Sequence, residues 1–135
     1  MSAGSALLCS TLLFVHVFVS ADQKNITAES GQDVTLTCRA PNNNILVVKW
    51  SRADLGDKHV LLYQDDHFDP FYQHPSFKNR VDLQDRQMKD GDVSLILKNV
   101  TINDAGTYIC DFFMEERLSW KHNFICLTVV DPPGE

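Results

Sequence analysis

The sequence predicts an all-β protein built as a sandwich of two antiparallel sheets. Short segments alternate apolar and polar residues with the two-residue period of a half-buried strand. Turn-forming residues separate these segments, and no apolar pattern with the helical period continues for about ten residues. Because short strands cannot bury their apolar sides singly, we expect them to form two stacked sheets around one core.

The N-terminus has the character of a secretory signal peptide, which we place at residues 1–21. The first 20 residues contain no Asp, Glu, Lys or Arg, and the apolar run Leu12–Val19 is shorter than the roughly 20 residues of a membrane span. Small residues precede Asp22, so cleavage is expected after Ala21. Residues 22–130 then form one small domain, and residues 131–135 form a C-terminal linker or tail.

Seven segments carry the strand pattern between residues that favour turns. In chain order the predicted strands are Val34–Cys38, Ile45–Ser51, His59–Gln64, Arg80–Leu83, Val93–Leu97, Tyr108–Phe112 and Asn123–Val130. The first shows the pattern clearly, because Val34, Leu36 and Cys38 alternate with threonines. Each such strand is expected to turn one side toward the core.

Composition argues against nucleic-acid binding and catalysis. The chain has 18 acidic and 12 basic residues, without the clustered Lys and Arg that phosphates require. Paired histidine ligands, a cysteine with a histidine base, and glycine-rich phosphate loops do not occur at useful spacing, so we predict no enzyme activity, metal or cofactor. The acidic loop around Asp65 and Asp69 is expected to be solvated, because a calcium loop supplies more oxygen ligands and a glycine turn.

A set of spaced residues resembles an immunoglobulin variable-type domain. Trp50 follows Cys38 by 12 positions, and the run Asp104–Cys110 reads DAGTYIC. The resemblance covers about residues 23–130 and implies a V-type sandwich with two extra strands between positions 59 and 72. It further implies a Cys38–Cys110 disulfide between the sheets, Trp50 packed against that disulfide, and Tyr108 bonded through its hydroxyl to nearby backbone.

The same resemblance places two charged residues at the lower end of the sandwich. Arg80 begins a predicted strand, and Asp104 lies where variable-type domains usually hold its ionic partner. We predict a bidentate, partly buried pair between these side chains, which would close that end of the domain. The alternative is two unrelated surface charges with almost no contribution to stability.

Three stretches, residues 63–70, 76–83 and 93–101, resemble butyrophilin-like and costimulatory-ligand domains. Antigen-receptor domains usually open the last strand with Phe-Gly-x-Gly, which Ser119–Phe124 lacks. The resemblance implies an extracellular module that binds a receptor protein on lymphocytes or other leukocytes and modulates their activation. A homophilic adhesion module that self-associates and a soluble decoy remain alternatives. Such families continue into a second domain and a membrane helix, so the chain is either a secreted single domain or part of a longer protein on the extracellular side of the plasma membrane.

Alternation within the strands nominates a partner-binding face. If Tyr108 and Phe112 point inward, their neighbours point outward, and the outward positions next to Trp50 lie beside them. The predicted partner face comprises Lys49, Ser51, Tyr63, Ile109, Asp111 and Phe113. Exposed apolar side chains with a polar rim have the composition of a small hot spot. The alternative is that scattered apolar residues are ordinary surface.

The remaining cysteine and two sequons complete the predicted sites. Cys9 leaves with the signal peptide, so Cys126 is a possible unpaired thiol: a small buried side chain, an interchain disulfide, or a reactive regulatory thiol. Asn25 and Asn99 each precede a threonine by two positions and are predicted N-glycosylation sites. Both are expected to lie away from the partner face.

Overall fold

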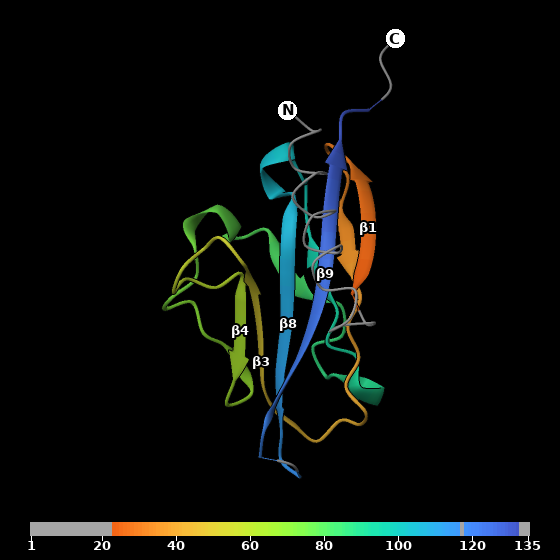
Figure 1. Cartoon of the computed structure of the whole chain (residues 1–135). Helices are drawn as coiled ribbons and strands as arrows, with labels where there is room; N and C mark the ends of the chain where they lie inside the picture. Colours follow the sequence, from red (N-terminus) through yellow and green to blue (C-terminus); the bar gives the residue numbers. More distant parts are fainter. Residues whose placement is uncertain (1–22, 117, 133–135) are drawn as a thin grey trace.

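A computed structural model describes residues 23–116 and 118–132, which fold into two packed sheets (Figure 1). The predicted signal peptide, residues 1–21, and most of the predicted tail lie outside the described residues. The all-β prediction and the two-sheet prediction are confirmed. The helices of the described residues are single 3-10 turns of three residues each, η1 (Pro75–Phe77), η2 (Lys89–Gly91) and η3 (Ile102–Asp104). None of them has the length and apolar character needed to cross a bilayer.

The larger sheet has six strands in the spatial order β1-β9-β8-β3-β4-β5, visible from the β1 edge across to β4 in Figure 1. Its strands are β1 (Lys24–Glu29), β3 (Ile45–Arg52), β4 (Leu61–Gln64), β5 (His67–Phe68), β8 (Gly106–Met114) and β9 (Trp120–Val130). The smaller sheet, in the order β2-β7-β6, consists of β2 (Val34–Leu36), β6 (Val81–Leu83) and β7 (Leu95–Leu97). All neighbours are antiparallel except β1 and β9, which run parallel.

Every predicted strand has a counterpart, and β4 and β5 are the two extra strands of the V-type sandwich. Two features were not predicted. β1 is an edge strand whose outward residues are polar, so its apolar signal is limited to Ile26 and Ala28. β9 begins at Trp120, three residues before the predicted start, because Trp120–Asn123 pair with β8 although they are mostly polar. Residues 120–123 adopt strand structure because they pair with β8, not because they are apolar.

The core forms where the inward side chains of both sheets meet. The predicted Cys38–Cys110 disulfide is confirmed and joins the two sheets. Trp50 is fully buried, and its Nε1–H donates to the Val93 carbonyl at 2.9 Å. This bond satisfies the one polar group of the indole, which would otherwise be costly to bury.

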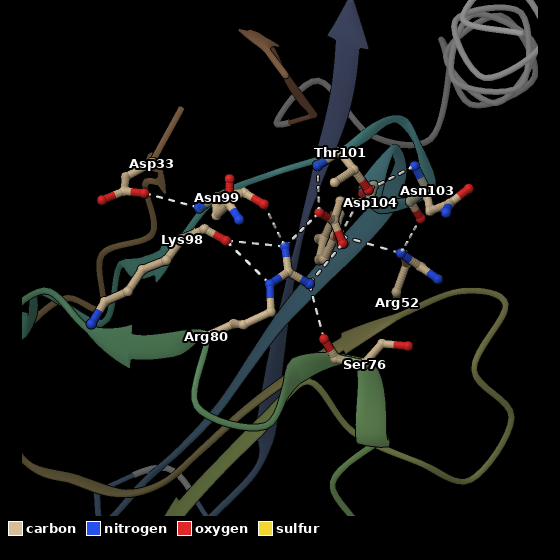
Figure 2. Close-up of polar contacts among 10 residues, drawn as sticks. Asp33, Arg52, Ser76, Arg80, Lys98, Asn99, Thr101, Asn103 and Asp104 are labelled. Atoms are coloured by element: carbon tan, nitrogen blue, oxygen red, sulfur yellow. Dashed lines mark hydrogen bonds and ion pairs between the residues drawn. The ribbon is translucent and has the colours of Figure 1, made fainter. Parts of the chain in front are cut away.

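Arg80 and Asp104 pair at the end of the sandwich that carries η3 (Figure 2). Arg80 Nη1 and Nη2 lie 3.2 and 2.6 Å from the Asp104 carboxylate oxygens, so the predicted bidentate pair is formed. The Asp104 side chain is 5 % exposed and also accepts from the Thr101 amide at 2.8 Å. Arg80 donates in addition to the carbonyls of Ser76, Lys98 and Asn99. Its hydrogen bond to Asp104 raises the pKa of Arg80.

Tyr108 lies behind this pair with its ring in the core. Its hydroxyl donates to the Asp104 carbonyl at 2.5 Å, in the corner arrangement that the resemblance implied. Burial raises the pKa of Tyr108 to about 12. Arg52 packs its guanidinium over the Phe77 and Tyr108 rings and bonds to Asp54, so a second arginine seals the same end.

Candidate functional site

We use the name outer face for the surface of β3, β8 and β9 that points away from the smaller sheet. Strand register assigns its residues, because directly paired residues lie on the same side of a sheet. Val48 and Trp50 are buried against the core, so their neighbours Val47, Lys49 and Ser51 belong to the outer face. Three rows follow across β3, β8 and β9: Val47 with Phe113 and Trp120, Lys49 with Asp111 and His122, and Ser51 with Ile109 and Phe124.

The first row of the outer face is aromatic. The rings of Phe113 and Trp120 meet edge to face with centroids 5.4 Å apart. Trp120 is 42 % exposed, and the Lys49 Nζ lies 5.8 Å from the centroid of its ring, within the range of a cation–π contact. Phe113 is half-buried beside it. These contacts hold a large, amphipathic side chain in one place at the surface.

The second row is charged. Asp111 Oδ1 and His122 Nδ1 form a hydrogen bond, and Lys49 lies at the paired position on the other side of Asp111. The Asp111 side chain is only 10 % exposed, so Asp111 lies near the centre of the outer face rather than at its rim. A partner covering this row would meet a carboxylate that already has basic neighbours on both flanking strands, which lowers the cost of desolvating it.

The predicted partner face contained five of the nine residues in these rows and missed Val47 on β3. Lys49, Ser51, Ile109, Asp111 and Phe113 come together as predicted from alternation. Three contributors from β9 were missed: Trp120, His122 and Phe124. Their signal was present in the sequence, because they alternate with the buried Ile125, Leu127 and Val129 when the β9 pattern is extended toward its N-terminal end.

Tyr63 was predicted to belong to the partner face, and this prediction is wrong. It pairs with Val48, which is fully buried, and so lies on the core side of β4. Its ring meets that of Phe68 on β5 with centroids 5.3 Å apart and packs against the core cluster. Sequence alternation alone could not fix this, because the side that Tyr63 takes depends on the register between β4 and β3.

The prediction for Cys126 is also corrected by the structure. It is 2 % exposed, and it is disulfide-bonded, so the interpretation as an unpaired thiol is wrong. No cysteine among the described residues is free. Cys126 pairs with Thr107 on β8 and lies on the opposite side of β9 from Ile125 and Leu127, which are buried in the core.

The two sequon asparagines are both exposed, Asn25 in β1 of the larger sheet and Asn99 just after β7 of the smaller sheet. Asn99 follows β7, and its backbone amide donates to Asp33 while its carbonyl accepts from Arg80 (Figure 2). Asn25 lies in β1 at the position paired with Cys126, on the same side of the larger sheet as the outer face. The expectation that both sequons lie away from the partner face is therefore wrong for Asn25.

The outer face has side chains of the types that are common in protein interfaces. It contains a tryptophan that contacts both a phenylalanine and a lysine. Such groups contribute strongly to protein interfaces, because aromatic side chains bury large areas at small entropic cost. Across residues 23–116 and 118–132, His, Cys, Asp and Glu side chains nowhere gather in a group of three that could hold a metal ion.

The sequence of this chain is similar to those of known proteins. The chain matches the immunoglobulin V-set domain profile over residues 21–130. Mouse programmed cell death 1 ligand 1 is 30 % identical over 97 residues, covering 68 % of this chain and 32 % of that protein. Mouse butyrophilin subfamily 1 member A1 is 31 % identical over 97 residues, covering 70 % of this chain and 18 % of that protein. This chain thus spans about a third or less of the length of these two curated relatives.

A solved structure shares the fold. The crystal structure of the human B7-H4 IgV-like domain superposes with a TM-score of 0.65 and 25 % identity, covering 82 % of this chain and 93 % of that chain. The two sheets, the intersheet disulfide and the buried tryptophan agree with this similarity. Since the profile match extends over most of the residues, the chain belongs to the immunoglobulin V-set family.

Proposed function

We propose that this chain is an extracellular protein-binding module of the butyrophilin-like type, which binds a receptor protein on lymphocytes through the outer face and modulates their activation. Its relatives include proteins named as a ligand of programmed cell death 1 and as a T-cell activation inhibitor. The proposed location is outside the cell, either secreted or as part of a longer protein on the plasma membrane, and the proposed chemistry is binding without catalysis.

The observation that carries the proposal is that the exposed Trp120 contacts both Phe113 and Lys49 on the outer face. Trp120 leaves 42 % of its surface exposed although two neighbours hold it in position. A tryptophan fixed in this way loses little further side-chain entropy on binding. More of the free energy gained by burying its ring therefore contributes to affinity. Truncation of such an anchor typically costs about 2 kcal/mol or more, which is roughly a 30-fold loss of affinity.

The test is binding of the tetramerised, fluorescently labelled protein to mixed leukocytes and to epithelial cells. Trp120→Ala removes the anchor. Phe71→Ala is the matched control, because Phe71 is 75 % exposed and lies in the loop between β5 and η1, outside the outer face. We expect lymphocytes to be stained by the unchanged protein and by the Phe71→Ala variant, and weakly or not at all by the Trp120→Ala variant.

Each other outcome points to a different conclusion. Staining confined to cells that express this same protein would favour homophilic adhesion. Equal staining by both variants would show that the partner binds elsewhere on the domain. Absence of lymphocyte staining by the unchanged protein would contradict the proposed receptor class.

A further inference from the structure

Asn25 stands at the edge of the larger sheet, one strand away from the outer face. β1 is the edge strand and pairs only with β9 in that sheet (Figure 1). The register sets Asn25 opposite Cys126, which in turn pairs with Thr107 on β8. Since adjacent strands lie about 5 Å apart, Asn25 is about 10 Å from β8 across the sheet. The next residues of the outer face are Ile109, two positions after Thr107 on β8, and Phe124, two positions before Cys126 on β9.

The Asn25 side chain is available for modification on this side of the strand. Asn25 and Thr27 are exposed, whereas Ile26 and Ala28, which alternate with them, face the core. Among residues 23–116 and 118–132 the Asn25 side chain makes no hydrogen bond that a glycan would displace. An Asn-x-Thr sequon in a secretory chain is an acceptor for a bulky, hydrophilic glycan.

From these positions we infer that Asn25 carries an N-glycan that covers the end of the outer face around Phe124, next to β1, and confines the protein partner to the rows that contain Lys49 and Trp120. The second half of this inference rests on the proposed function. Phe124 would lie under or beside the glycan, while Lys49, Phe113 and Trp120 lie in rows farther along the strands. The glycan would also cover the unpaired edge of β1, where exposed backbone groups could otherwise pair with another chain.

The chain offers a matched pair of variants for the test. Thr27→Ala removes the Asn25 sequon and Thr101→Ala removes the Asn99 sequon, and each leaves its asparagine in place. Asn99 follows β7 of the smaller sheet, so its glycan is expected to leave the outer face uncovered. The full chain is secreted from mammalian cells, glycan occupancy is measured by peptide mass before and after enzymatic deglycosylation, and side-chain exposure is measured by hydroxyl-radical footprinting.

We expect glycan mass at Asn25 in the unchanged protein, and greater oxidation of Phe124 in the Thr27→Ala variant than in the unchanged protein. Oxidation of the distant Phe71 should be the same in both, and Thr101→Ala should leave Phe124 unaffected. An unmodified Asn25, or equal oxidation of Phe124 with and without the glycan, would overturn the inference. These readouts need no receptor, so they can fail or succeed independently of leukocyte staining, which tests the proposed function.

Discussion

Replacing Arg80 with alanine should destabilise the domain severely, because it leaves a buried carboxylate without its cation. The Asp104 side chain is 5 % exposed and receives two bonds from Arg80. After the substitution the Asp104 carboxylate still accepts from the Thr101 amide at 2.8 Å, but no cation faces it among the described residues. The carbonyls that Arg80 also bonds belong to exposed residues, which can turn to water instead.

The expected loss of folding free energy depends on how deeply the Arg80–Asp104 pair is buried. Removing one member of a buried ion pair costs about 3–5 kcal/mol, and we take the lower end because the Arg80 side chain is 26 % exposed. About 3 kcal/mol is a large share of the roughly 5–15 kcal/mol that stabilises a typical domain. At about 4–8 °C for each kcal/mol in a domain of this size class, the Tm should fall by about 12–24 °C.

The assay is urea unfolding followed by tryptophan fluorescence, with Arg86→Ala as the control. Arg86 makes the same bidentate contact to a carboxylate, that of Asp82, but its side chain is 66 % exposed. Solvent screens such a pair, so its loss should scarcely move the unfolding midpoint. Similar midpoints for Arg80→Ala and Arg86→Ala would refute the argument that burial decides the strength of these pairs.

Further stability predictions concern pH and backbone conformation. Because the folded pKa of Tyr108 is about 12 and its ordinary value is 10.0, the stability it contributes is complete below pH 10.0 and is lost as pH rises toward about 12, by about 3 kcal/mol. Alkaline unfolding of the unchanged protein and of Tyr108→Phe checks this, and an equal loss in both would contradict it. Gly91→Ala should lower the free energy of unfolding by about 1 kcal/mol through backbone strain, because Gly91 has φ +81°. A further loss of about 1–3 kcal/mol is expected from a clash, because the new Cβ would lie 2.2 Å from the Ala40 carbonyl oxygen. Gly31→Ala, at φ +93° with nothing within 4 Å, should show the strain alone, and thermal unfolding should separate the two variants.

Local pattern determined most of the fold. The period-two alternation around Leu36, Leu95 and Cys110 predicted which side of each strand is buried, and these residues are in the core. The spacing of Trp50 and Tyr108 relative to the cysteines implied the V-type arrangement, and the two rings are fully buried. Such features are predictable because each depends on residues close in sequence or on a pattern that a whole family shares.

The composition of the outer face depended on tertiary structure. Alternation along one strand says which residues share a side, but it does not say which residue of another strand lies opposite. The register of β4 on β3 placed Tyr63 against the core, and the register of β9 on β8 added Trp120 to the outer face. The parallel pairing of β1 with β9 brought Asn25 to the same side. The sequence by itself determined most of the strands and of their buried sides, whereas only the packed sheets decided which side chains meet, because register is set by long-range pairing and burial together.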